Sequence, residues 1–133
     1  MSRFFEWNES KFSVHVPQMD AEHRAIIACM NRLHDLHEAK VTGQKLVNTV
    51  IELGNITVKH FADEETYMRK IGFPDLANHA LIHKRLLENF SRHKEQAVAN
   101  GTVSDEFFTF LKTWLKIHIC GIDMKYSEHR QAA

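Results

Sequence analysis

The stretch HFADEETYM spans residues 60–68 and carries His60 and Glu64 four residues apart. Side chains at this spacing lie on the same face of a helix. Both continue an apolar stripe at steps of three and four, which is typical of a helix face turned toward a core. We therefore predict a helix over residues 44–70 that points an imidazole and a carboxylate inward. Its stripe is Leu46, Val50, Leu53, Thr57, His60, Glu64 and Met68.

The rest of the chain repeats this helical pattern. An irregular arm is expected over residues 1–18, and Asp20 is a good residue to cap the helix that follows it. Four amphipathic helices joined by short loops indicate an all-α fold, an antiparallel up-down four-helix bundle, in one domain over residues 1–133. The three further helices are predicted over residues 20–39, 75–100 and 104–126.

Composition argues against several classes of protein. The chain has 17 Lys plus Arg and 17 Asp plus Glu, so its formal net charge of zero gives no attraction to nucleic acid or an anionic membrane. No run of about 18 apolar residues could cross a membrane, and residues 1–10 lack the apolar core of a secretory signal. Two distant cysteines, Cys29 and Cys120, favour a reducing compartment over a disulfide scaffold. We expect a cytoplasmic monomer.

Ten histidines in 133 residues are unusually many, and their positions are more informative than their number. A single histidine on an apolar helix face is usually a core residue bonded to a backbone carbonyl, and a glutamate beside a histidine is usually an ion pair. Five imidazoles and a buried carboxylate in one small core could not all find neutral partners, whereas a metal centre satisfies them together. Besides His60, the histidines on apolar faces are His23, His79, His83 and His118.

The types of ligand narrow the choice of metal. Imidazole and carboxylate without thiolate suit iron, zinc, copper or manganese. Six ligands are too many for one tetrahedral zinc ion, and two ions bridged by a carboxylate fit better. The motif HALIH at residues 79–83 has Ala80 where a zinc protease has glutamate, which disfavours that chemistry. The carboxylate-rich Glu-x-x-His pattern of ferritin-like proteins does not match this histidine-rich set either.

Four motifs together resemble the hemerythrin family: MDAEH at 19–23, HFADEETYM at 60–68, NHALIH at 78–83 and WLKIHICGID at 114–123. The resemblance implies a four-helix bundle around a non-heme di-iron centre that binds dioxygen reversibly. Its two iron ions (Fe2+/Fe3+) would share a bridging hydroxide or oxide. The implied ligands are Glu64 and Asp123 as bridges, His79, His83 and His118 on a six-coordinate iron, and His23 and His60 on the five-coordinate iron that takes dioxygen.

Asp123 is the implied ligand that the helical pattern does not place by itself. It lies five residues after His118, about 140° further round an ideal helix. Either a π-type distortion brings the two side chains together, which the neighbouring Gly121 would ease, or Asp123 reaches in from near a helix end.

Apolar neighbours of the ligands are expected to keep water away from bound dioxygen, although each could equally be ordinary bundle core. This oxygen pocket is Phe61, Trp114, Leu115 and Ile119. Cys120, beside His118, is expected to be a buried thiol. The histidines interpreted as non-ligands are His15, His34, His37, His93 and His129.

These features predict a dioxygen-binding protein that stores oxygen or delivers it to an oxygen-consuming enzyme, and is not itself an enzyme. Three alternatives stay open at this point. The same centre could act as a di-iron oxidase or peroxidase, it could detoxify nitric oxide or iron, or it could sense oxygen through a separate partner protein.

Overall fold

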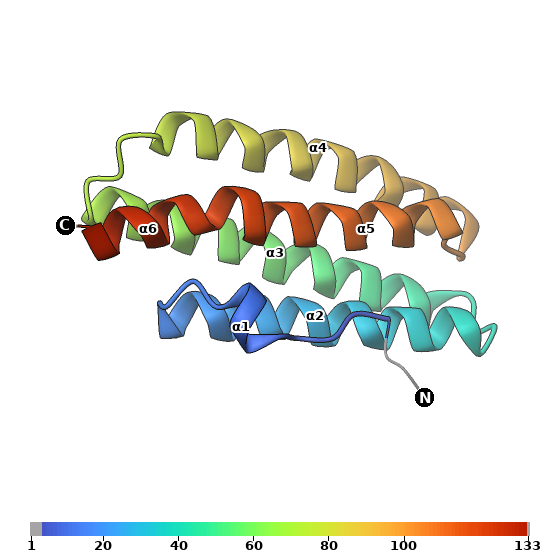
Figure 1. The fold of residues 1–133 in the computed structure, drawn as a ribbon. Coiled ribbons are helices and arrows are strands. Elements are labelled where there is room, and N and C mark those ends of the chain that lie inside the picture. Colours follow the sequence, from blue (N-terminus) through green and yellow to red (C-terminus); the bar gives the residue numbers. More distant parts are fainter. Residues whose placement is uncertain (1–3, 133) are drawn as a thin grey trace.

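The protein, seen in a computed structural model that describes residues 4–132, is an antiparallel helical bundle (Figure 1). This confirms the predicted all-α fold. Residues 1–3 and 133, which belong to the expected arm and domain, lie outside the described residues. The elements are α1 Glu9–Phe12, α2 Pro17–Glu38, α3 Gln44–Lys70, α4 Leu76–Asn100, α5 Asp105–Ile117, η1 His118–Asp123 and α6 Met124–Ala132. Of these, α5, η1 and α6 form one continuous rod (Figure 1).

The loops at one end of the bundle are tied together through two glycines. Gly101 ends α4 in the left-handed conformation, and the amide of Gly43 donates a hydrogen bond to its carbonyl over 2.8 Å. A Cβ at Gly101 would lie 3.3 Å from the Gly43 nitrogen, so both conformation and space favour glycine there. Ser104 then begins α5 by accepting a hydrogen bond from the Phe107 amide.

The start of α2 differs from the prediction, because the helix begins at Pro17 and not at Asp20. Proline suits the first turn of a helix, where its fixed φ is already helical and its missing N–H costs nothing. Asp20 fastens the arm instead, accepting hydrogen bonds from the Ser13 hydroxyl at 2.6 Å and the Val14 amide at 2.9 Å. The arm is also less irregular than predicted, since it contains the single turn α1.

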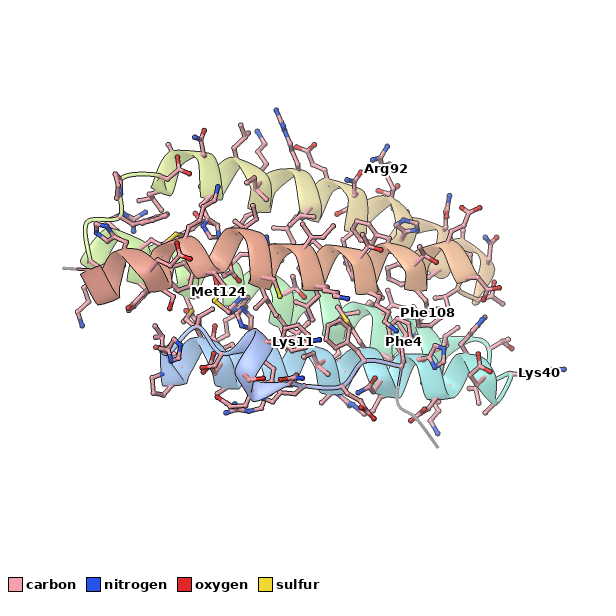
Figure 2. All side chains as sticks on the ribbon, viewed as in Figure 1. Phe4, Lys11, Lys40, Arg92, Phe108 and Met124 are labelled. Atoms are coloured by element: carbon pink, nitrogen blue, oxygen red, sulfur yellow. The ribbon has the colours of Figure 1, made fainter. Side chains whose placement is uncertain are left out.

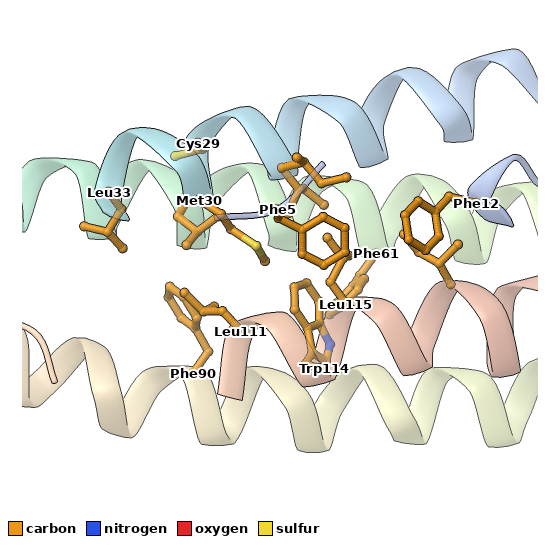
Figure 3. Close-up of a cluster of buried hydrophobic side chains, with 14 of the residues drawn as sticks. Phe5, Phe12, Cys29, Met30, Leu33, Phe61, Phe90, Leu111, Trp114 and Leu115 are labelled. Carbon is orange, nitrogen blue, oxygen red and sulfur yellow. The ribbon is translucent and has the colours of Figure 1, made fainter. Parts of the chain in front are cut away.

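Aromatic residues of the arm complete the core of the bundle. The Phe5 backbone makes two hydrogen bonds, each 2.9 Å, with the side-chain amide of Asn31 on α2. Its buried ring joins Met30, Leu111 and other core side chains (Figure 3). Phe4 packs edge-on against Phe108 with ring centroids 5.4 Å apart (Figure 2). The arm thus covers apolar surface of α2 and α5 that would otherwise face water.

Close contact between α3 and α4 brings the polar residues of the core together. A Cβ at Gly54 would lie only 2.8 Å from the ring of Phe90, so glycine lets these helices approach. Along the antiparallel pair, His60 follows Gly54 by six residues and His83 precedes Phe90 by seven. The two histidines therefore come to the same level of the bundle.

Candidate metal centre

Four parts of the bundle contribute seven polar side chains to one buried cluster. No side chain of this cluster is more than 2% exposed. Their nitrogen and oxygen atoms form two overlapping groups, and within each group they lie within 4.8 Å of one another. The first group is Glu64, His79, His83, His118 and Asp123, and the second is His23, His60, Glu64 and Asp123. All seven residues singled out from the sequence are thus brought together.

The two carboxylates are common to both groups, and each divides its oxygens between them. Asp123 Oδ1 lies 2.9 Å from the Nε2 atoms of both His79 and His118, whereas Oδ2 lies 3.1 Å from His23 Nε2. Glu64 Oε1 lies 2.9 Å from His83 Nε2, whereas Oε2 lies 3.4 Å from His60 Nε2. A carboxylate that spans two ions needs this arrangement, with one oxygen facing each.

Several of these atoms are buried without a hydrogen bond. Among the described residues, neither oxygen of Asp123 has a hydrogen-bond partner, and the same is true of Nε2 of His23, His60 and His79. Unsatisfied buried polar atoms cost free energy, and metal coordination would satisfy all of them at once. Imidazole and carboxylate donors without thiolate suit iron. The residues present therefore fit a di-iron site.

Electrostatics of the metal-free cluster show how strongly its members interact. Burial opposes a charged imidazole at His60, but the carboxylates of Glu64 and Glu22 outweigh it and raise the pKa of His60 to about 10. Burial likewise opposes charge at His118, where Asp123 and Glu64 raise the pKa to about 9. Without metal, these raised pKa values favour the protonated imidazoles. A metal ion must displace these protons, so metal binding releases them.

Three further side chains position the cluster from outside. His60 Nδ1–H donates a hydrogen bond to Glu22 over 2.6 Å, and His83 Nδ1–H donates to Glu65 over 2.9 Å. Each hydrogen bond orients its imidazole ring so that the Nε2 atom is directed at the cluster. The bond also makes Nε2 more basic and therefore a stronger metal ligand. The Tyr126 hydroxyl, itself fully buried, donates to Glu64 Oε2 over 2.9 Å.

These three partners were missed in the sequence. Tyr126 carried a usable signal, because it follows Asp123 by three residues and so lies on the same helix face. Glu22 and Glu65 carried no such signal, since each is a glutamate of the kind common on helix surfaces and stands next to a cluster residue, His23 or Glu64. Their pairing with His60 and His83 depends on how α2, α3 and α4 pack together.

The helix carrying His118 and Asp123 takes the first of the two predicted alternatives. Residues His118–Asp123 form the π-helix η1, in which a residue bonds to the one five positions away, so both side chains face inward. The expectation of a buried Cys120 was wrong, because its thiol is exposed. Two residues after the inward-facing His118, the helix has turned Cys120 to the outside.

Two of the four residues predicted to form the apolar pocket, Phe61 and Trp114, pack against histidines of the cluster. Phe61, Trp114, Leu115 and Ile119 are all buried. The Phe61 ring stacks flat on His83, with centroids 3.9 Å apart and an interplanar angle of 5°, and Trp114 meets Phe61 edge-on. The other histidines belong to neither group of the cluster: His15, His34, His37, His93 and His129.

Comparison with known proteins agrees with this geometry. Residues 14–129 match the sequence model of the hemerythrin HHE cation-binding domain. The chain is 29% identical to a bacteriohemerythrin of Stenotrophomonas maltophilia, covering 95% of this chain and 81% of that protein. It is 32% identical to a myohemerythrin of Riftia pachyptila, covering 92% and 90%. A crystal structure of wild-type hemerythrin superimposes with a TM-score of 0.81 at 28% identity, covering 93% and 95%.

Proposed function

The chain belongs to the hemerythrin family, and on that premise we propose that it binds dioxygen reversibly at a non-heme di-iron centre, for storage or for delivery to oxygen-consuming enzymes. The observation that carries the proposal is the division of each carboxylate between two groups of histidines. Glu64 and Asp123 would bridge the ions in this proposal, with His79, His83 and His118 on one and His23 and His60 on the other.

The unequal number of histidines supports dioxygen binding at one of the two ions. Three histidines lie on one side of the bridging carboxylates and only two on the other. The ion beside His23 and His60 therefore has fewer protein ligands and can accept an external one. Bound iron, with a bridging hydroxide or oxide, would supply the two electrons that dioxygen takes up and gives back on release.

The surroundings of the centre favour a carrier over an enzyme. Phe61 and Trp114 place aromatic rings beside the ligand histidines, and Leu115 and Ile119 are buried in the same core. Together they would exclude water, which would otherwise promote irreversible oxidation. Among the described residues, the outer carboxylates that touch the ligand histidines are already engaged, Glu22 by His60 and Glu65 by His83. An oxidase or peroxidase would need an acid or base left free to serve the reaction.

Reversible oxygenation can be tested by visible absorption. The protein is loaded with iron, reduced without air, exposed to dioxygen and then placed under vacuum, with metal content measured on the same sample. The proposal predicts two irons per chain and an absorption band that appears with dioxygen and disappears under vacuum over repeated cycles. A centre that oxidises once and releases no dioxygen would contradict it, as would a single zinc ion per chain.

Within residues 4–132, none of the helices is both long and apolar enough to cross a membrane.

A further inference from the structure

A wide apolar groove runs along the surface between α4 and α5 and continues past η1. Its volume is about 550 Å³. Leu86 and Ile82 line it from α4, Phe110 and Trp114 from α5, and its inner wall reaches the ligand His118. Ile117 on the same wall is 61% exposed, so the apolar surface of the groove extends to solvent. Its polar lining is confined to His118, Glu106 and the threonines Thr109 and Thr113.

Beneath the groove lies a much smaller cavity inside the bundle. Leu86, Phe110 and Trp114 line both spaces, so these three side chains form the partition between them. The cavity leaves only about 10 Å³ for the centre of a water-sized molecule. Its far wall is Phe61, which stacks on His83 and lies beside His60. Figure 3 shows Phe61 and Trp114 together between the helices at this point.

The cavity is unsuited to water. A buried water molecule needs two to four polar partners, whereas apolar cavities stay dry and take up apolar gases. The hydroxyl of Thr57 is the polar group in the cavity wall besides the Trp114 indole, and it already donates to the Leu53 carbonyl over 2.7 Å. The other lining residues, Phe61, Leu86, Leu87, Phe90 and Phe110, offer hydrocarbon alone.

Trp114 can move without breaking a hydrogen bond. Its indole N–H is buried and finds no acceptor within the part of the chain that the structure describes. Its position is therefore held by packing, chiefly against Phe61 and His118, with ring centroids at 5.9 and 6.3 Å. A small displacement of this ring would widen the passage from groove to cavity.

From these observations we propose that dioxygen reaches the metal centre through the groove, past Leu86 and Trp114, and through the cavity behind Phe61. This route rests on the proposed function, because it gives the path taken by the ligand of that centre. Water and hydrated anions are held back by a path that offers them almost no hydrogen bonds. Dioxygen, which is apolar and only slightly larger than water, is admitted.

The test is a comparison of oxygen kinetics in matched variants of the full iron-loaded chain. Leu86→Trp fills the partition, and Leu81→Trp adds the same ring at an exposed position of the same helix that does not line the groove. In Leu86→Trp, the rates of oxygen association and dissociation should both fall roughly tenfold, with an unchanged dissociation constant, as a higher barrier on one shared path requires. Leu81→Trp should keep the original rates, and Leu86→Ala should raise both.

The route would be overturned if Leu86→Trp and Leu86→Ala both kept oxygen association and dissociation rates within twofold of the original. If oxygenation were still reversible in these variants, the proposed function would remain intact. A second measurement does not depend on that function. Crystals of the unsubstituted protein under xenon pressure should hold xenon against Leu86 and Trp114, and crystals without xenon there would overturn the route. Occupation of the groove by a second copy of the chain would also overturn it, and would show as association rates that depend on protein concentration.

Discussion

The two halves of the metal centre share their carboxylates but differ in their histidines and in their support. The half built by α4 and η1 has three histidines, one backed by Glu65 and covered by the flat ring of Phe61. The half built by α2 and α3 has two, one backed by Glu22. One half thus offers more protein ligands than the other, and in the proposed function this difference would allow an external ligand to bind at the incomplete half without displacing the protein.

Removing a shared carboxylate should have the largest effect, because it damages both halves together. Glu64→Ala deletes a fully buried group that faces all five histidines of the cluster through one or other oxygen. We expect the iron content to fall from two ions per chain to nearly none, measured by elemental analysis after loading and desalting. Helical circular dichroism should be retained, and retention of both irons would refute the bridging role.

Single histidine substitutions should separate the halves. His23→Ala leaves the two-histidine half with one imidazole, whereas His83→Ala leaves the other half with two. We expect His23→Ala to retain about one iron per chain and lose oxygen binding, and His83→Ala to retain more iron than His23→Ala. Equal losses in the two variants would mean that the halves are not distinct.

The metal-free protein should show how each half holds its protons. The pKa of His60 is raised from 6.5 to about 10 and that of His118 to about 9, while the pKa of Glu64 is well below its usual value of 4.5. Raised imidazole pKa values stabilise the fold fully below pH 6.5, and this contribution is lost as the pH rises toward 10. The lowered carboxyl pKa contributes above pH 4.5 and is lost as the pH falls through the lowered value.

The free energy of unfolding of the metal-free chain should therefore be highest between about pH 4.5 and 6.5, and several kcal/mol lower at pH 10. Urea titrations at a series of pH values measure this. Iron loading provides the control, because metal-bound imidazole nitrogens carry no proton and the loss above pH 6.5 should disappear. If the metal-free protein were more stable at pH 10 than at pH 6, the protonated histidines would not form stabilising ion pairs with the buried carboxylates.

Substitution of the outer carboxylates offers a matched pair with one member in each half. Glu22→Gln and Glu65→Gln each keep the shape of the side chain but weaken its bond to His60 or His83. Loss of such a partner typically costs about 10- to 100-fold in metal affinity or activity. We expect Glu22→Gln to change oxygen affinity and autoxidation more than Glu65→Gln, since His60 belongs to the incomplete half. The reverse order would place the open position on the other ion.

The smallest effect should come from His15, which leads into α2 and so into the incomplete half. His15 has a φ of 60°, a conformation that glycine adopts more readily than histidine. His15→Gly should stabilise the protein by about 1 kcal/mol in urea titrations, because relieved strain exceeds the extra chain entropy. Iron content and oxygen affinity should not change. Lost iron would show that the arm shapes the centre.

Sequence periodicity predicted most of the fold because helical stripes of apolar residues extend over many turns. It also placed six of the seven cluster residues on inward faces without help from any relative, since Glu64 and the five histidines continue those stripes. The seventh is Asp123. Asp123 depended on the π-helix, whose register an ideal helix does not contain. The start of α2 was wrong because Asp20 resembles a cap in sequence, while its actual partners are in the arm.

Contacts between different helices could not be predicted from the sequence. Glu22 and Glu65 acquire their role only when neighbouring helices bring His60 and His83 to them. Such residues look like ordinary surface or core positions until the packing is known.

Anomalous X-ray diffraction at the iron absorption edge would locate both ions and so show whether two unequal halves share the carboxylates. Crystals of the iron-loaded protein should show two iron peaks between Glu64 and Asp123. One should lie against His79, His83 and His118, and the other against His23 and His60. A single peak, or a second peak away from the two carboxylates, would show that the two halves do not form a bridged pair of sites.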